Sequence, residues 1–264
     1  MKRRILMSMS FLGIVLLLAG GLAWTASRQP QEAPNADAAK EIVLIAAVGD
    51  NTSVEQLAPG FEAKTGYKIK VTFAVSGMIK KKVIDGEPFD VAVLLMPIAD
   101  ALATGNLVES SVKPMAGMPI AMAMKKGAPK PDVSTPEALK QTLLAAKAIS
   151  YPHGTPGALA GILMDDMLNK LGITDQMLPK VNRGGIAAVV KGDVDFAFLF
   201  QPEVRDPGVE IVGPLPAAVL PVAQMVGALS SHAKNPAIAK QLLDYLSSPA
   251  AKAVYISKGM VPAS

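Results

Sequence analysis

Short apolar segments alternate with amphipathic segments along most of the chain. Runs such as 42–48 and 90–95 are rich in Val, Ile and Leu, which is typical of strands that are buried on both faces. The stretches between them carry apolar residues at helical spacing and end at glycines. This alternation predicts an α/β protein with mostly parallel strands flanked by helices.

The same pattern gives approximate positions for the elements. Strands are expected at 42–48, 67–74, 90–95, 120–124, 148–151, 194–200, 209–212 and 222–229. Capping-box spacing at 52–55 and at 134–137 predicts two helix starts. The pairs Asn235-Pro236 and Ser248-Pro249 predict the starts of two closing helices.

The pattern of residues at the N-terminus predicts an export signal. Lys2, Arg3 and Arg4 precede an apolar run that reaches Trp24, so residues 1–26 are expected to be a signal peptide or an uncleaved signal anchor. Residues 27–40 are polar and rich in Ala and Pro, which is typical of a disordered linker. Both alternatives predict a periplasmic or otherwise extracytoplasmic protein, either free or tethered by its N-terminal helix.

Charge and composition exclude several functions. The net charge is +4, and residues 1–28 supply it with four basic residues and no acidic one. The remainder is neutral, so no nucleic-acid partner is expected. The chain has no cysteine and only two histidines, and it lacks the common hydrolase, zinc-protease and phosphate-loop motifs. The sequence therefore predicts no catalytic residue, no metal and no cofactor.

Four junctions between a predicted strand and a predicted helix carry glycine or small polar residues. They lie at 49–53, 75–78, 153–157 and 183–186. In open α/β sheets, ligands bind beyond the carboxyl ends of the strands, where helix N-termini offer free N–H groups to an anion. The same residue types also cap helices without any ligand, so each junction alone leaves both interpretations open.

Several segments, in this order, resemble a known family. They are IVLIAAVGDNTSVEQLAPGFEAKTGYKIKVTF, VSGMIKKKVIDGEPFDVAVL, VVKGDVDFAFLF and NPAIAKQLLDYLSSPAAKAVYISKGMVP. Over about residues 41–262 the chain resembles the periplasmic substrate-binding proteins of ABC importers, in the group that includes molybdate-binding proteins. The resemblance implies the two-lobed type II periplasmic-binding fold, with lobe one at 41–117 and 215–264 and lobe two at 118–214. It also implies a monomer that closes on a small anionic solute by a hinge motion and delivers it to an ABC permease.

The family's ligand residues are only partly matched here. A serine that follows the first strand in molybdate binders is replaced by Gly49, while the serine of the next junction is matched by Ser76. A tyrosine near the end of the 194–200 strand is replaced by Phe200. Two oxyanion donors are therefore missing, which favours an organic carboxylate over molybdate or tungstate. A tethered ligand sensor with the same fold is a further alternative.

Several further residues are candidates for the ligand site. A guanidinium at Arg183 could grip a carboxylate through two hydrogen bonds, and His153 could add a donor; a solvated arginine and a packing histidine are the alternatives. Gln201 matches a glutamine in a related branch of the family. The full set of expected ligand-binding residues is Gly49, Asp50, Asn51, Ser76, Gly77, His153, Thr155, Gly157, Arg183, Gly184 and Gln201.

Four methionines gather near the expected first crossover between the lobes. Methionine-lined sites can hold copper, but methionines at alternating strand positions are more typical of core packing. We therefore expect core roles for Met115, Met118, Met122 and Met124.

Overall fold

A computed structural model describes residues 40–264 of the chain. The expectations of a signal peptide or anchor at 1–26 and of a linker before residue 40 lie outside the described residues. Within the described part, no helix is both long enough and apolar enough to cross a membrane.

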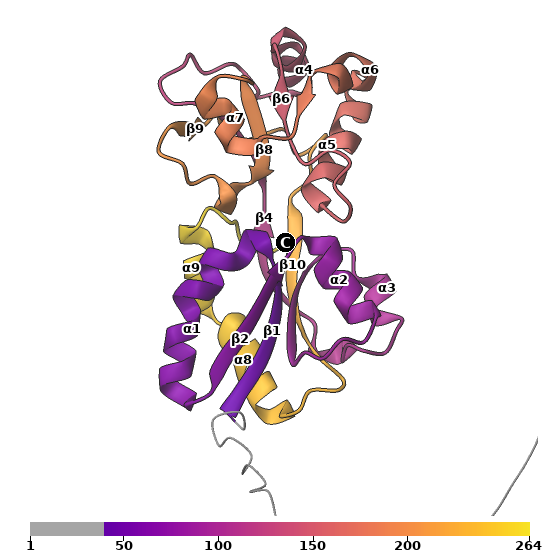
Figure 1. Ribbon diagram of the computed structural model, residues 1–264, viewed down its shortest axis with the longest axis vertical. Helices are drawn as coiled ribbons and strands as arrows, with labels where there is room; N and C mark the ends of the chain where they lie inside the picture. Colours follow the sequence, from indigo (N-terminus) through magenta and orange to yellow (C-terminus); the bar gives the residue numbers. More distant parts are fainter. Residues whose placement is uncertain (1–39) are drawn as a thin grey trace, which may run out of the picture.

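The first sheet forms the lower body in Figure 1, which we call lobe one. Its strands, in spatial order, are β2 (Lys68–Ala74), β1 (Glu41–Ala47), β3 (Val91–Leu95), β10 (Ala223–Leu229) and β4 (Lys113–Met118). One face packs against α1 (Asn51–Thr65), α8 (Pro236–Leu246) and α9 (Pro249–Ser257). The other face packs against α2 (Ser76–Ile84) and α3 (Ala99–Leu102), so both faces of this sheet are covered.

The second sheet forms the upper body, lobe two. Its strands, in spatial order, are β7 (Val181–Asn182), β6 (Ile149–Ser150), β8 (Phe196–Phe200), β5 (Ile120–Lys125) and β9 (Val209–Ile211). Its helices are α4 (Pro136–Ala145), α5 (Leu159–Lys170), α6 (Thr174–Met177) and α7 (Gly185–Lys191).

The two-lobed α/β architecture is confirmed, but the sheets are mixed rather than mostly parallel. Each sheet has two parallel and two antiparallel strand pairs. The antiparallel pairs all involve β10 or β5, the strands next to the two connections between the lobes. The chain crosses upward between β4 and β5 and returns between β9 and β10. The predicted lobe boundary at 117/118 falls one residue before the end of β4.

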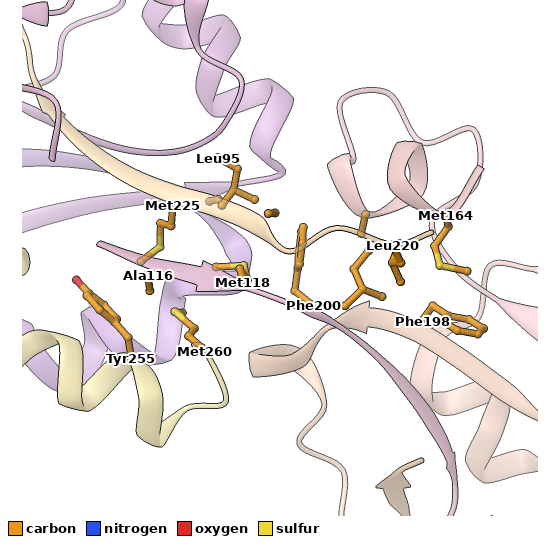
Figure 2. Close-up of a cluster of buried hydrophobic side chains, with 14 of the residues drawn as sticks. Leu95, Ala116, Met118, Met164, Phe198, Phe200, Leu220, Met225, Tyr255 and Met260 are labelled. Carbon is orange, nitrogen blue, oxygen red and sulfur yellow. The ribbon is translucent and has the colours of Figure 1, made fainter. Parts of the chain in front are cut away.

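One apolar cluster continues from lobe one through the waist into lobe two. Figure 2 shows Phe200 and Leu220 between Met118 of lobe one and Met164 of lobe two. All four crossover methionines are buried, as expected of core residues: Met115, Met118, Met122 and Met124. The waist is therefore a packed joint between the two lobes.

Local sequence signals fix some helix starts and miss others. Asn235 and Ser248 cap α8 and α9 by accepting the N–H groups of residues 238 and 251, as predicted. The capping box at 52–55 was wrong. Helix α1 begins at Asn51 after Asp50, and no side chain caps it.

Strand β4 was not predicted, because it reads KPMAGM and begins with a proline and lacks alternation. It lies at the edge of its sheet, where proline is tolerated since one side of the strand makes no ladder hydrogen bonds. The sequence pattern therefore missed β4, which leads into the first connection between the lobes.

The C-terminal segment returns to the waist. The N–H of Gly117 donates to the carbonyl of Val261 at 2.8 Å, and the N–H of Val261 donates back to the carbonyl of Gly117 at 2.8 Å. The N–H of Ser264 donates to the side chain of Gln224 on β10. Residues 261–264 thus lie beside both strands that approach the crossovers (Figure 1).

Candidate functional site

A cavity of about 150 Å³ lies between the lobes, at the carboxyl ends of β1, β2 and β8. Sheets of this kind bind ligands at this edge. Both lobes contribute to its wall: Ala47, Val48, Gly49, Val75, Ser76 and Leu95 from lobe one, and Pro152, Thr155, Ala158, Leu159, Ala160, Leu199, Phe200 and Glu203 from lobe two. Of the expected ligand residues, the cavity wall therefore includes Gly49, Ser76 and Thr155.

On one side of the cavity the lobes touch through their backbones. The N–H of Gly77 donates to the carbonyl of Gly157 at 2.8 Å. The hydroxyl of Ser76 donates to the same carbonyl at 3.2 Å and accepts the N–H of Leu159 at 3.3 Å. The start of α2 in lobe one is thus bonded to the segment before α5 in lobe two.

Glycine is required on both sides of this contact. A Cβ added to Gly77 would lie 2.4 Å from the Cα of Gly157, which is too close for two carbon atoms that are not bonded to each other. Gly157 itself has φ +73°, in the left-handed region that disfavours side chains. The two expected residues Gly77 and Gly157 thus face each other as a contact between lobes.

Arg183 lies at the edge of the cavity. Its Nη2 donates to Thr155 Oγ1, a cavity-wall residue, at 2.9 Å. The guanidinium is otherwise exposed, and the structure gives it no carboxylate partner within the described residues. The Arg183 guanidinium is therefore attached to a residue of the cavity wall and keeps N–H donors that the described residues do not use. Neighbouring Gly184 precedes α7, where its N–H bonds to Asn182, and it does not line the cavity.

His153 does not line the cavity. Its Nδ1 lies 2.9 Å from Asp165 Oδ1, and the hydroxyl of Tyr151 donates to that same oxygen at 2.7 Å. Burial and the adjacent carboxylate raise the pKa of Tyr151. The histidine expected to donate to a ligand is instead part of a cluster on lobe two, outside the cavity wall.

The three expected ligand residues after β1, Gly49, Asp50 and Asn51, lie in different surroundings. Gly49 lines the cavity, packed against Met118 and Phe200. Asp50 is fully buried in lobe one, and neither of its carboxylate oxygens has a hydrogen-bond partner. Burial raises the pKa of Asp50 to about 8. Asn51 Oδ1 accepts from Arg205 Nη2 of lobe two at 2.6 Å, which adds a further hydrogen bond between the lobes at another place.

Gln201 does not line this cavity. Its side chain packs against Gly259, and it lines a separate hollow of about 370 Å³ formed with the returning segment 211–222. Gln201 lines a different hollow from its neighbours Phe200 and Glu203 because the short helical turn Gln201–Glu203 directs successive side chains to different sides.

Glu203, from the same turn, does line the cavity and was not predicted. Its Oε2 accepts the N–H of Phe200 at 3.1 Å. Burial raises the pKa of Glu203, and the nearby Arg205 guanidinium opposes this only in part. The sequence did hold a signal, since a carboxylate comes directly after the carboxyl end of the apolar run 196–200.

Within residues 40–264, no three carboxylate or imidazole groups come together in a way that could hold a metal ion. The chain contains no cysteine to add a thiolate. Three helices of eight or more residues, α1, α2 and α5, begin close to the cavity, and their N-terminal ends carry partial positive charge. The cavity thus combines the positive ends of these helices with an apolar wall that includes Leu95, Leu159 and Phe200.

Two lobes, two crossovers and an interlobe cavity define a periplasmic-type binding protein. A solved periplasmic molybdate-binding protein of Azotobacter vinelandii has the same fold, with a TM-score of 0.68 at 17% identity, covering 84% of this chain and 100% of that one. Residues 42–261 match the bacterial extracellular solute-binding proteins, and the chain belongs to this family.

Two curated relatives are similar over nearly the whole chain. An aconitate isomerase of a Pseudomonas species is 31% identical, covering 84% of this chain and 87% of its own length. The molybdate-binding protein ModA of Azotobacter vinelandii is 26% identical, covering 96% of this chain and 98% of its own length. The family confirms the predicted resemblance to the molybdate-binding group and implies a small anionic solute and a permease partner. It also supports the expected location outside the cytoplasmic membrane.

Proposed function

We propose that this protein captures a small organic carboxylate between its lobes by hinge closure and delivers it to an ABC permease. The observation that carries the proposal is the position of Arg183, whose guanidinium is fixed to the cavity-wall residue Thr155 and keeps free donors. A guanidinium binds a carboxylate through two parallel hydrogen bonds, which gives both affinity and orientation.

The cavity wall favours an organic anion over a tetrahedral oxyanion. The resemblance to molybdate binders implies that Gly49 and Phe200 replace two of their hydroxyl donors, and both residues line the cavity. Most other wall residues are apolar, which fits the carbon skeleton of a carboxylic acid better than a fully hydrated oxyanion. The relative named as an aconitate isomerase supports a carboxylate as well.

That relative also supports a second candidate function. A chain that is 31% identical to an isomerase over 84% of its length could itself convert a bound carboxylate. The observation favouring this reading is Glu203, an ionisable side chain in the cavity wall that anion binding alone does not require.

Thermal unfolding tests the binding function directly. The purified protein is unfolded and refolded on a column to remove bound ligand and then heated with molybdate, tungstate, sulfate, phosphate, and di- and tricarboxylates. A ligand at a hundred times its Kd stabilises by about 2.7 kcal/mol, a shift of a few degrees. A shift with carboxylates supports the proposal. A shift with molybdate or tungstate alone would replace it with an oxyanion transporter component, and no shift with any anion would favour the sensor.

Replacing Arg183 with alanine is expected to weaken carboxylate binding about 10- to 100-fold, because a charge-assisted hydrogen bond contributes roughly 1.5–3 kcal/mol. Calorimetric titration with the carboxylate that stabilises the wild type measures the loss. Arg183→Lys keeps the charge but not the paired donors, so it should recover only part of the affinity. The matched control is Lys191→Ala, which removes an exposed cation at the far end of α7. Unchanged affinity in Arg183→Ala would show that Arg183 does not bind the carboxylate.

A further inference from the structure

Glu203 places a carboxyl group in the wall of a cavity that we propose binds an anion, and this position needs an explanation. Glu203 is the one ionisable side chain in the cavity wall as the described residues form it. A negative charge there would repel the bound anion, so the position is unfavourable for binding alone unless the group holds a proton. Glu203 is therefore the feature of the site that the binding function leaves unexplained.

The surroundings of Glu203 suit a group that gains and loses a proton. Its Oε2 is fixed by the N–H of Phe200, which leaves Oε1 free. No lysine or arginine nitrogen lies within ion-pair distance of it among the described residues, so no cation holds it permanently ionised. Burial raises the pKa of Glu203 above its ordinary value, although the Phe200 N–H and the Arg205 guanidinium oppose this in part.

We infer that Glu203 is the acid–base residue of a proton shift on an unsaturated polycarboxylate bound in this cavity. The inference rests on the proposed binding of a carboxylate at this site. The substrate class is an acid with a CH₂ group between a carboxylate and a carbon–carbon double bond, in which that C–H bond is the most acidic.

The step balances without any additional reagent. The Glu203 carboxylate takes a proton from the CH₂ carbon, and the C–H electron pair spreads over the three allylic carbons and the adjoining carboxylate. Protonated Glu203 then returns the proton to the other terminal carbon of the allyl unit. The double bond moves by one carbon, and its new configuration is cis or trans according to how the skeleton is held. No group is oxidised, reduced or released.

The rest of the cavity supports this step. The closing contacts of Ser76 and Gly77 with Gly157 shut one side of the cavity, and Leu95 and Phe200 line it with hydrocarbon, so water has little access to the carbanion. The positive ends of α1, α2 and α5 favour the negative charge that gathers on the substrate carboxylates.

The experiment uses the full chain with cis-aconitate and trans-aconitate in D₂O, followed by proton NMR. Two signals are recorded: interconversion of the isomers and exchange of the CH₂ hydrogens for deuterium. Saturated tricarballylate, which has no allylic C–H bond, serves as a binding probe by thermal shift. The wild type should be stabilised by tricarballylate and should interconvert the aconitates, and deuterium should enter the CH₂ group to the extent that protonated Glu203 exchanges its proton with solvent before returning it.

Glu203→Gln keeps the acceptor for the Phe200 N–H but removes the base. It should lose exchange and interconversion at least about 100-fold, the range typical of a lost acid–base group, while its unfolding temperature and its shift with tricarballylate stay close to those of the wild type. The control Glu137→Gln removes an exposed carboxylate of α4 in the same lobe and should leave both signals unchanged.

The outcomes separate the two proposals. A wild type that is stabilised by tricarballylate but neither exchanges nor interconverts the aconitates overturns the proton shift and keeps the binding function. Activity in Glu203→Gln equal to the wild type overturns the role of Glu203. No stabilisation by any carboxylate overturns the binding function, and this inference with it.

Discussion

Replacing Gly77 with alanine is expected to hold the lobes apart and to weaken ligand binding about 5- to 150-fold. The new methyl group would lie 2.4 Å from the Cα of Gly157, and neither backbone can move aside without opening the cleft. Overpacking of this kind costs about 1–3 kcal/mol. In the proposed hinge motion an open form would separate Gly77 from Gly157, so the cost would fall on closure and would lower the affinity for ligand by the corresponding factor.

Calorimetric titration and small-angle X-ray scattering measure the two consequences. Gly77→Ala should bind the stabilising carboxylate weakly and should keep a larger radius of gyration when it is added, with little change in the unliganded unfolding temperature. Gly213→Ala adds the same methyl group where it meets no atom within 4 Å, and it should behave like the wild type. Normal affinity in Gly77→Ala would mean that ligand is held without this contact.

The largest pH effect on stability is expected from Asp50. Its pKa is about 8 in the folded protein, against an ordinary value of 3.8. Between those values the unfolded chain releases the proton while the folded chain keeps it, so stability falls as pH rises through this window, by about 1.4 kcal/mol for each pH unit across most of it. Asp50→Asn removes the titrating group and should flatten this fall, matching the wild type near pH 4 and exceeding it near pH 8.

Urea unfolding at several pH values between 4 and 8.5 tests this expectation. A suitable contrast is Asp90→Asn, because Asp90 is also buried but its two oxygens accept the N–H groups of Val43 and Lys234 at 2.8 and 2.9 Å. An amide has a single acceptor oxygen, so this variant should lose about 1–3 kcal/mol at neutral pH. If Asp50→Asn is instead destabilised near pH 8, the carboxylate has a partner in solution that satisfies it.

Much of the order of elements could be predicted, because most strands and helices other than β4 follow from a local signal. The apolar runs at β1, β3 and β8 indicate buried strands, and Asn235 and Ser248 indicate helix starts, since these signals act within four residues. The mixed character of the sheets could not be predicted. It depends on how β5 and β10 pair after the chain crosses between lobes, a contact between distant segments.

The candidate site could likewise be predicted from the sequence only in part. Three of the four predicted junctions contribute residues to the cavity wall, but the sequence did not show which residue of each junction faces the cavity. Gly49 and Asp50 are neighbours, yet Gly49 lines the cavity and Asp50 is buried in lobe one, since the short helical turn 48–50 directs successive residues to different sides. For the same reason the cavity wall includes Glu203, while Gln201 lines a different hollow.

The pairing of Val261 with Gly117 gives residues 261–264 a practical use as a reporter position. Because these residues lie against the strands that lead into both crossovers and do not line the cavity between the lobes, a dye placed there would report the proposed hinge motion without blocking the cavity. The chain has no cysteine of its own, so Ser264→Cys would provide a single thiol for labelling. The labelled protein would be a fluorescent sensor of its own ligand.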